Sequence, residues 1–387
     1  MLNPPIEGHH IASKEMIEAS LRTGIASRVL SVESRSQKQR DNKGVITINS
    51  RITRLDGRFW FFPGVVSAFD DLLASLEILR RARFLNVDLV HVLNMNKEAF
   101  LTIRYISRFK LPVLLHFFHS SFVLRDDVFL IRKLVFKTGL YSRGNNHVLT
   151  VNRSMLHYFV EKIRLNPKLV HYAPYPVDTD RFKPLDKKRQ LREKYALSPD
   201  RPTVVYVGSL APSRGIINLL KSVPYWTKSM PNALLFVSHP RRQGEEVYER
   251  YVQHMIRSLK LQENVVVQGP CRNIEEVYNL ADLVALPFIR PYWVDPPLVL
   301  LEAMSCGSTV VTTPVGAISE VVESNEDGVF ADFQEPCLLG KTIVRLLEDP
   351  QTSLTIGRKA RGRVLKENSY EAVGSNLGKI YDSILNN

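Results

Sequence analysis

One acidic side chain, Glu302, lies inside an apolar stretch whose periodicity predicts a helix. Leu298, Leu301 and Ala303 are predicted to form the buried stripe of this helix, and Asp295 could cap it with its carboxylate. A carboxylate in a buried helix is costly unless some group pairs with it. A ligand rich in hydroxyl groups would supply that partner, so Glu302 is a candidate binding residue.

Both ends of this helix carry local signals. Pro297 suits the first helical turn, and Gly307 suits the position just past the last one. Residues 309–313 follow at once and are β-branched, which predicts a buried strand. The stretch is therefore typical of loop, helix, turn and strand.

A second candidate segment, residues 203–215, places Gly208 and Gly215 on either side of one cation, Arg214. Its pattern predicts a strand, a glycine-rich turn and the start of a helix. A helix start offers free N–H groups and the positive end of the helix dipole, which suit a diphosphate. An ordinary strand-to-helix turn with a surface arginine is the alternative.

Other combinations of reactive side chains are sparse. Asp178 and Asp180 form an Asp-x-Asp pair in a proline-rich stretch, where we expect a turn or cap role. The three cysteines are scattered, so they indicate neither a disulfide framework nor a metal site. No Ser-His-Asp or Cys-His arrangement stands out, and we expect no metal ion.

The elements that must position these residues alternate between strand and helix in two series. The first series has predicted strands at 88–93, 111–118, 147–151 and 169–172, with helices at 66–84, 97–109, 125–140 and 153–164. The second has predicted strands at 203–208, 233–238, 264–268, 282–286, 309–313 and 328–331. Apolar strands that alternate with helices predict α/β domains with parallel sheets covered on both faces.

Two stretches depart from this alternation. Residues 4–32 are predicted to form loop, helix and strand, with Gly8 and His9 in the loop, where either close backbone approach to a ligand or a simple turn would fit. Residues 174–200 contain four prolines and a charge run, which indicate a linker between domains.

Composition sets the broad class. A chain of 387 residues with 44% hydrophobic and 24% charged residues is typical of a soluble protein with two domains. No stretch reaches about 18 uncharged apolar residues, and the start lacks a signal-peptide profile, so we expect a cytoplasmic protein. The net charge of +13 is concentrated in residues 1–200, with 33 Lys and Arg against 19 Asp and Glu. A generally basic surface and an anionic partner for this half are both open.

The stretch Leu-Val-Leu-Leu-Glu-Ala-Met-Ser-Cys-Gly around Glu302 resembles the donor-site signature of retaining glycosyltransferases with the GT-B fold, in particular glycosyltransferase family 4. That signature has two glutamates separated by seven residues. Glu302 matches the second, which in the family binds the ribose hydroxyls of a nucleotide-sugar. Val294 stands at the place of the first, and Asp295 follows it. The resemblance implies donor-binding roles for Pro297, Leu298 and Glu302 and a sugar-contacting, catalytic role for Asp295, with a helix cap as the alternative.

The glycine-rich loop fits the same resemblance. In the family this loop carries an arginine after the first glycine and a lysine before the second. Here Ser209 replaces the arginine, and Arg214 replaces the lysine and keeps its charge. Sugar transfer breaks the bond to a nucleoside diphosphate, so fixed positive charge beside the leaving group lowers the barrier. The resemblance implies that Arg214 is catalytic and that Gly208, Ser209 and Gly215 bind the donor.

Further positions follow from the resemblance with alternatives left open. Arg272 lies where the family loop meets the nucleotide base, and an exposed arginine is the alternative. Tyr292 and Trp293 could pack against the sugar or base, or belong to the core. His119 follows a predicted strand end, where the family places a catalytic histidine facing the donor sugar. His116 is the alternative, and a structural role is open for both.

The resemblance also implies a domain plan with two Rossmann-like domains and parallel sheets facing across a cleft. The expected parts are an acceptor-side domain (1–178) whose first strand is missing or truncated, a linker (179–200), a nucleotide-sugar-binding domain (201–365) and a helix that crosses back to the first domain (366–387).

Together these features predict a hexosyltransferase. It would move a sugar from a UDP- or GDP-sugar to a glycan or lipid-linked acceptor with retention of configuration, without a metal or other cofactor. The alternative is a GT-B binding or scaffold protein with impaired catalysis, which Ser209 and Val294 favour. The basic first half does not indicate nucleic-acid binding, because the chain contains no recognised binding module.

The segment 122–137 combines rings and cations at helical spacing, with Phe129, Arg132, Lys133 and Phe136 on one side. A core-facing helix with a basic edge is one interpretation. The other is a helix on an anionic membrane surface, which would hold the protein peripherally at the inner face of the membrane beside a lipid-linked acceptor.

Overall fold

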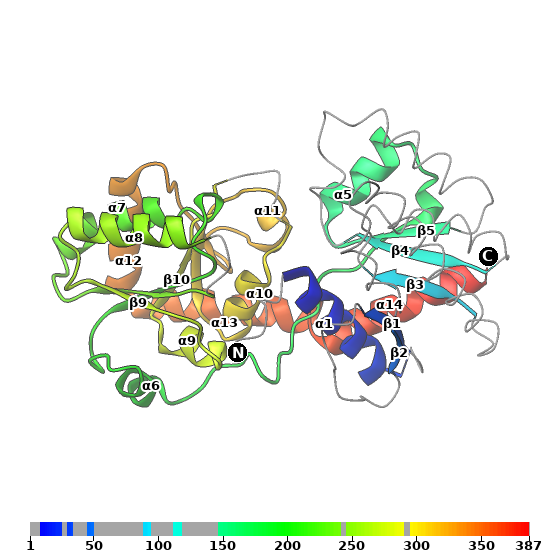
Figure 1. Ribbon diagram of the computed structural model, residues 1–387, viewed down its shortest axis with the longest axis horizontal. Helices are drawn as coiled ribbons and strands as arrows, with labels where there is room; N and C mark the ends of the chain where they lie inside the picture. Colours follow the sequence, from blue (N-terminus) through cyan, green and yellow to red (C-terminus); the bar gives the residue numbers. More distant parts are fainter. Residues whose placement is uncertain are drawn as a thin grey trace, which may run out of the picture. The chain divides into compact units, whose positions relative to one another are not determined.

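The computed structural model describes residues 8–24, 29–33, 45–49, 88–93, 111–117, 146–240, 245–289 and 295–386. The chain divides into two compact units, whose elements are labelled in Figure 1. Unit 1 contains residues 1–11 and 175–372, and unit 2 contains residues 12–174 and 373–387.

Unit 1 is built on a six-stranded parallel sheet with the strand order β12-β11-β10-β7-β8-β9. The strands are β7 (Thr203–Val207), β8 (Leu234–Ser238), β9 (Val265–Gln268), β10 (Leu283–Leu286), β11 (Thr309–Thr312) and β12 (Val329–Phe330). All six were predicted. Every side chain of β7, β8, β10 and β11 is buried, as expected for strands in a sheet covered on both faces.

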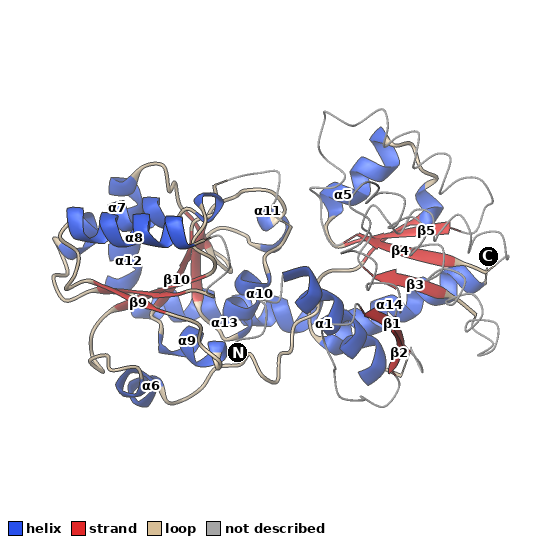
Figure 2. Ribbon diagram, viewed as in Figure 1, coloured by secondary structure: helices blue, strands red, loops and turns tan. Residues whose placement is uncertain are grey.

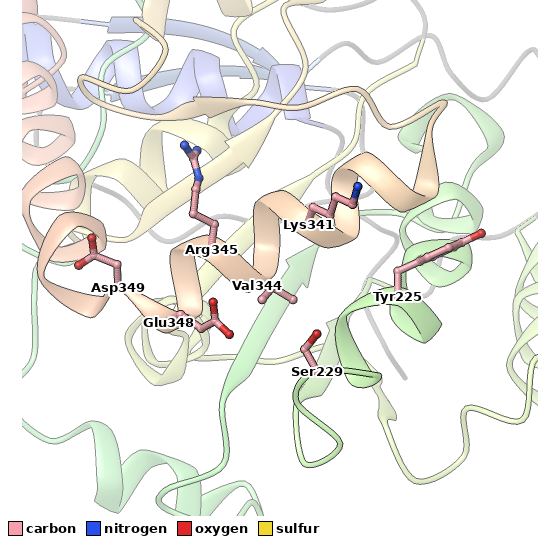
Figure 3. Close-up of a pocket in the computed structure, with 7 residues that line it drawn as sticks. All are labelled: Tyr225, Ser229, Lys341, Val344, Arg345, Glu348 and Asp349. Carbon is pink, nitrogen blue, oxygen red and sulfur yellow. The ribbon is translucent and has the colours of Figure 1, made fainter.

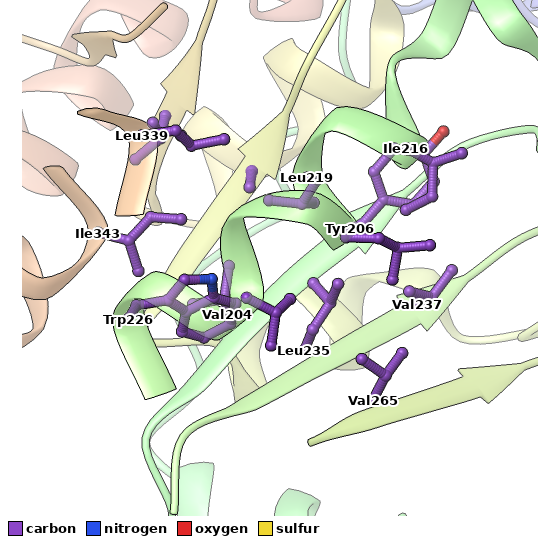
Figure 4. Packing of buried hydrophobic residues seen from close by; sticks show 14 of the residues in the cluster. Val204, Tyr206, Ile216, Leu219, Trp226, Leu235, Val237, Val265, Leu339 and Ile343 are labelled. Atoms are coloured by element: carbon purple, nitrogen blue, oxygen red, sulfur yellow. The ribbon is translucent and has the colours of Figure 1, made fainter. Parts of the chain in front are cut away.

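Two helical layers cover this sheet (Figures 1 and 2). One contains α7 (Ile216–Thr227), α8 (Glu246–Ser258) and α12 (Pro336–Glu348), and the other contains α9 (Ile274–Leu280), α10 (Leu298–Ser305) and α13 (Pro350–Glu367). Figure 4 shows Trp226 of α7 and Ile343 of α12 packed with Val204 of β7 in the core. Gly340 lets α12 approach α7, because a Cβ there would lie 2.6 Å from the Cβ of Tyr225.

A short helix, α6 (Lys188–Lys194), lies within the residues predicted as a linker. Its Arg192 is buried and donates from Nε to the Leu280 carbonyl at 3.0 Å and from Nη2 to Asp282 at 2.6 Å. The charge run therefore contributes a side chain that ties this segment to the end of α9.

Unit 2 contains a four-stranded parallel sheet with the order β3-β4-β5-β6 and a separate parallel pair, β1-β2. The strands are β1 (Val29–Glu33), β2 (Val45–Asn49), β3 (Val90–Leu93), β4 (Val113–Phe117), β5 (Asn146–Thr150) and β6 (Val170–Tyr172). Among the described residues, its helices are α5 (Arg153–His157), which continues as a π-helix (Tyr158–Lys162), and most of α1 (Gly8–Arg22) and α14 (Tyr370–Leu385). The sequence did not predict β2 or the π-helix.

The two faces of the four-stranded sheet pack differently. On one face, Leu115 and Phe117 of β4 join Met155 and Phe159 in an apolar core. On the other side, α14 contacts the sheet through Tyr381, whose hydroxyl lies 2.6 Å from Nδ1 of His91 in β3.

Candidate active site

The carboxyl ends of β7, β10 and β11 lie side by side at one edge of the unit 1 sheet, because β10 pairs with both neighbours in parallel. Hydroxyl groups of β11 and of the residue after it donate hydrogen bonds to the end of β10 and to the segment that follows it. Thr312 donates to the Leu286 carbonyl at 2.8 Å, and Thr313 donates to the Phe288 carbonyl at 2.7 Å. The loops that follow these strands are therefore held together at the strand ends.

At Gly215 the loop after β7 passes very close to the loop after β10. Its φ of 67° is left-handed, and a Cβ at this position would lie 1.8 Å from the Pro287 carbonyl oxygen. The amide of Ile289 also donates to the Ser213 carbonyl at 3.1 Å. Only glycine fits here, for both conformational and steric reasons.

Arg214 ends the single 3₁₀ turn, Pro212–Arg214, that precedes α7. Its guanidinium carbon lies 5.2 Å from the centroid of the Phe288 ring, which is within the range of a cation–π contact. The cation predicted at the start of α7 is thus positioned over the β10 loop.

Tyr206 supports the same loop from below. Its hydroxyl donates to the carbonyl oxygen of Ser209 at 2.7 Å, and Ser209 itself is buried. Burial raises the pKa of Tyr206 above its usual value, while the nearby charge of Arg214 acts in the opposite direction. The phenol therefore stays protonated as a donor. A Cβ at Gly208 would lie 3.2 Å from this hydroxyl oxygen, so a small residue suits the turn.

Glu302 has a partner inside the protein. The hydroxyl of Tyr278 in α9 donates to its Oε2 at 2.8 Å. Tyr278 is buried, and burial together with the charge of Glu302 raises its pKa well above the usual value. The sequence analysis assigned this partner to a bound ligand and did not identify Tyr278, because no local pattern relates a residue of α9 to one of α10.

The ends of α10 were predicted with mixed success. The structure begins the helix after Pro297 with no side-chain cap, so the predicted cap by Asp295 is wrong. Asp295 is instead buried, and its charge helps to raise the pKa of the buried Tyr175. Leu298 is half-buried rather than fully buried. Gly307 ends the helix as predicted, with a φ of 73° and its amide donating to the Met304 carbonyl at 2.9 Å.

Comparisons with known proteins identify the domain that holds these residues. The family model described as "Glycosyl transferases group 1" matches residues 187–363, which include Arg214, Gly215, Tyr278 and Glu302. The matched residues, 187–363, are named the group 1 domain after this model, and they make up less than half of the chain.

Curated relatives that match part of the chain are named as glycosyltransferases and have low identity to it. A GDP-mannose-dependent alpha-(1-6)-phosphatidylinositol monomannoside mannosyltransferase from Mycolicibacterium smegmatis is 29% identical over 64% of this chain and 65% of the relative. A D-inositol 3-phosphate glycosyltransferase from Segniliparus rotundus is 28% identical over 50% of this chain and 42% of the relative. The chain thus spans less than two thirds of the length of these two relatives.

Solved structures extend the likeness beyond the group 1 domain to the whole fold. A glycosyltransferase from Rickettsia africae has a TM-score of 0.75 at 17% identity and covers 100% of this chain and 97% of its own. The Anabaena protein HepE in complex with UDP has a TM-score of 0.74 at 17% identity and covers 98% of both chains. The chain has the GT-B fold, with the group 1 domain in unit 1.

The remaining predicted residues of the group 1 domain take separate places. Arg272 is exposed in the loop before α9. Asp178, just before the domain, accepts from the backbone amides of Asp180 at 3.2 Å and Arg181 at 3.0 Å, so the predicted turn role is confirmed. Val294, with Tyr292 and Trp293, lies outside the described residues.

The predicted site residues of the first predicted domain, 1–178, do not form a cluster among the described residues. Gly8 and His9 lie in the first turn of α1 rather than in a loop, so the loop prediction is wrong. His119 and the segment 122–137 lie outside the described residues. His116 is fully buried in β4, with Nδ1 3.2 Å from Nε2 of His91, and burial lowers its pKa well below the usual value.

A hollow of ≈ 390 Å³ lies on the group 1 domain away from the strand ends (Figure 3). It is lined by Tyr225 and Ser229 near the end of α7 and by Lys341 and Arg345 of α12. Because α7 begins at the carboxyl edge of the sheet, its last residues lie toward the opposite edge. The hollow is therefore separate from the loops that carry Arg214.

Among the residues that the structure describes, no group of three or more His, Cys, Asp or Glu side chains is arranged to hold a metal ion. Among the same residues, no helix is both long and apolar enough to cross a membrane.

Proposed function

We propose that this protein is a glycosyltransferase that uses a nucleotide-sugar donor, a UDP- or GDP-sugar. The observation that best supports this proposal is the contact of Gly215 with the Pro287 carbonyl, which locks two strand-end loops together and positions Arg214. Open α/β sheets bind their ligands, nucleotides among them, outside the carboxyl ends of the parallel strands. The group 1 domain match over these residues supports the same interpretation.

We propose a separate role in the reaction for each of two described residues, Arg214 and Glu302. Arg214 would stabilise the charge that develops on the departing nucleoside diphosphate, together with the loop amides. Glu302 would bind the ribose hydroxyls. Ser209 carries no charge, so Arg214 would supply the cationic part of this loop. We propose transfer with retention at the anomeric carbon, as the sequence resemblance implies for the family.

The donor base and the acceptor need a direct test, because the relatives differ. The HepE structure contains UDP, whereas the Mycolicibacterium enzyme is named for GDP-mannose and for a phosphatidylinositol mannoside acceptor. We propose a glycan or lipid-linked acceptor, which an anionic membrane surface could present. A ligand that binds only the folded state raises the melting temperature, so a thermal-shift screen of UDP, GDP and their sugars identifies the donor class.

Turnover tests the enzymatic part of the proposal. Each donor that raises the melting temperature would be incubated with candidate glycan and lipid acceptors, and release of nucleoside diphosphate would be measured. Release that depends on acceptor supports the proposal. A protein that binds neither nucleotides nor nucleotide-sugars contradicts it.

A GT-B binding protein with impaired catalysis is the second candidate. The observation that favours it is Ser209, a buried serine in place of the loop arginine. Nucleotide-sugar binding without release of nucleoside diphosphate from any donor–acceptor pair would support this candidate over the first.

We further propose that transfer needs no metal ion. One carboxylate oxygen of Asp178, Oδ1, accepts from two backbone amides, which supports a structural role for this residue. Activity should therefore survive excess EDTA. Activity that disappears with EDTA and returns with Mn²⁺ would contradict this part of the proposal.

A further inference from the structure

The carboxylate of Glu302 lies in a small set of contacts made by α9 and the end of α10. Tyr278 donates to its Oε2 at 2.8 Å. The thiol of Cys306, one turn further along the chain from Glu302, is buried, and burial followed by the charge of Glu302 raises its pKa. Both neighbours remain in their protonated forms and leave the negative charge on Glu302.

Tyr278 is itself held in place at several points. Its ring meets Phe182 edge-on, with centroids 6.2 Å apart, and it is only 1% exposed. Its backbone carbonyl accepts from the hydroxyl of Ser308 at 3.1 Å. A buried ring with a fixed backbone points its hydroxyl in one direction, so it can orient the group to which it donates.

A carboxylate that binds two neighbouring ribose hydroxyls must hold its plane in one orientation, so that each oxygen faces one hydroxyl. The terminal torsion of a glutamate side chain is broad, so Glu302 alone does not fix this orientation. A donor fixed on one oxygen restricts the torsion, and each oxygen can accept more than one hydrogen bond. The contact between Tyr278 and Glu302 is therefore compatible with simultaneous ribose binding.

We infer that Tyr278 is a positioning residue, which orients the Glu302 carboxylate for the ribose of the donor and so makes this site selective for ribonucleotides. The inference rests on the proposed function, because it requires that Glu302 bind the ribose. Tyr278 acts through Glu302 and does not touch the donor.

The test removes one hydroxyl group at a time. Tyr278→Phe keeps the buried ring and removes the donor. Tyr195→Phe is the matched control, because the Tyr195 hydroxyl also donates to a glutamate of α9, Glu276, at 3.2 Å. Affinities for UDP, GDP and their 2′-deoxy counterparts would be measured by calorimetry for both variants and the wild type, with melting temperatures recorded alongside.

For whichever nucleotide binds, Tyr278→Phe should weaken binding of the ribonucleotide about five- to tenfold, an effect about as large as one ordinary net hydrogen bond. Binding of the 2′-deoxy nucleotide should change less than about twofold, and Tyr195→Phe should change neither. In the Glu302→Gln background, Tyr278→Phe should have little further effect, because both changes act on one interaction.

The outcomes separate this inference from the function on which it rests. If the wild-type protein binds neither UDP nor GDP, the proposed function fails and the inference with it. If the wild type binds one of them and Tyr278→Phe binds it equally well, only the inference is overturned. Equal losses for the ribonucleotide and its 2′-deoxy form would also overturn it, because they indicate a general structural role.

Discussion

The two larger sheets of this protein are both parallel but differ in what they bury. In unit 1 the central strands β7, β8 and β10 bury mainly aliphatic side chains on both faces. In unit 2 one face is apolar, whereas the other carries His91, His116, His147 and His171 from four successive strands. The strand register places all four on the same face. His91 and His147 both pair with Leu114 of β4, His116 lies two residues after Leu114, and His171 pairs with the residue two positions after His147.

The rings of these histidines form two hydrogen-bonded pairs. Nε2 of His91 lies 3.2 Å from Nδ1 of His116, and Nδ1 of His147 lies 2.9 Å from Nε2 of His171, with stacked rings in both pairs. Burial lowers the pKa of His91 to about 3 and that of His171 to about 4. The stability of unit 2 therefore depends on neutral imidazoles, whereas the stability of the unit 1 sheet depends on how well its aliphatic side chains pack. The difference predicts that pH and steric changes act on different units.

The largest effect should come from Gly215→Val in unit 1. The new side chain would overlap the Pro287 carbonyl, because even a Cβ would lie 1.8 Å from that oxygen. We expect loss of stability of about 3 kcal/mol or more and loss of nucleotide binding. Urea unfolding measures the first and calorimetry the second. Gly362→Ala is the control, since a Cβ there meets no described heavy atom within 4 Å; equal effects at both positions would contradict the role assigned to Gly215.

Arg214→Ala should leave unit 1 folded but slow the reaction. If Arg214 stabilises the leaving diphosphate more than the bound donor, kcat should fall about 10²- to 10³-fold, as on removal of an oxyanion donor. Steady-state kinetics with the identified donor provide the measurement. A rise in KM with kcat intact would show that Arg214 serves in binding alone.

Acid should destabilise unit 2 selectively. The folded pKa values of its buried histidines lie below the unfolded value of about 6.5, so the unfolded state binds more protons and stability falls as pH decreases below that value. For His91, whose folded pKa is about 3, the loss between pH 7 and pH 5 should be about 2 kcal/mol. Hydrogen exchange at both pH values can compare β4 with β7. Equal acid sensitivity of the two strands would contradict the comparison, and His157→Gln, at a side chain 65% exposed, provides a neutral control.

The smallest effect should follow Tyr381→Phe in α14. This change removes the hydroxyl that lies 2.6 Å from Nδ1 of His91 and leaves the ring in place. Loss of one such hydrogen bond should cost about 1 kcal/mol. Chemical unfolding at pH 7 measures it. An unchanged midpoint would show that α14 does not depend on the histidine face for its stability.

The sequence predicted the strands of unit 1 well, because short aliphatic runs bounded by turn residues specify strands locally. It also predicted the turn at Gly215 before α7 and the end of α10 at Gly307, since these depend on neighbours in the chain. The functional roles of Arg214 and Glu302 stay predictions. The sequence could not show that Tyr278 meets Glu302. The histidines were likewise included in strands described as apolar, because their pairing depends on register between strands.

Two errors have a related physical cause. Asp295 was predicted as a helix cap from its position before two prolines, yet the helix begins later and Asp295 is buried near Tyr175. Gly8 and His9 were predicted in a loop, whereas the structure places them in α1. In both cases the local preference of the sequence is weak.

The position of α14 has a consequence for biosynthesis. Its residues 373–387 group with unit 2, where Val373 and Leu377 are fully buried, although most of that unit precedes unit 1 in the chain. During translation the early strands of unit 2 leave the ribosome well before the helix that covers them. The histidine face must therefore wait for α14, and in that interval it offers chaperones an open surface.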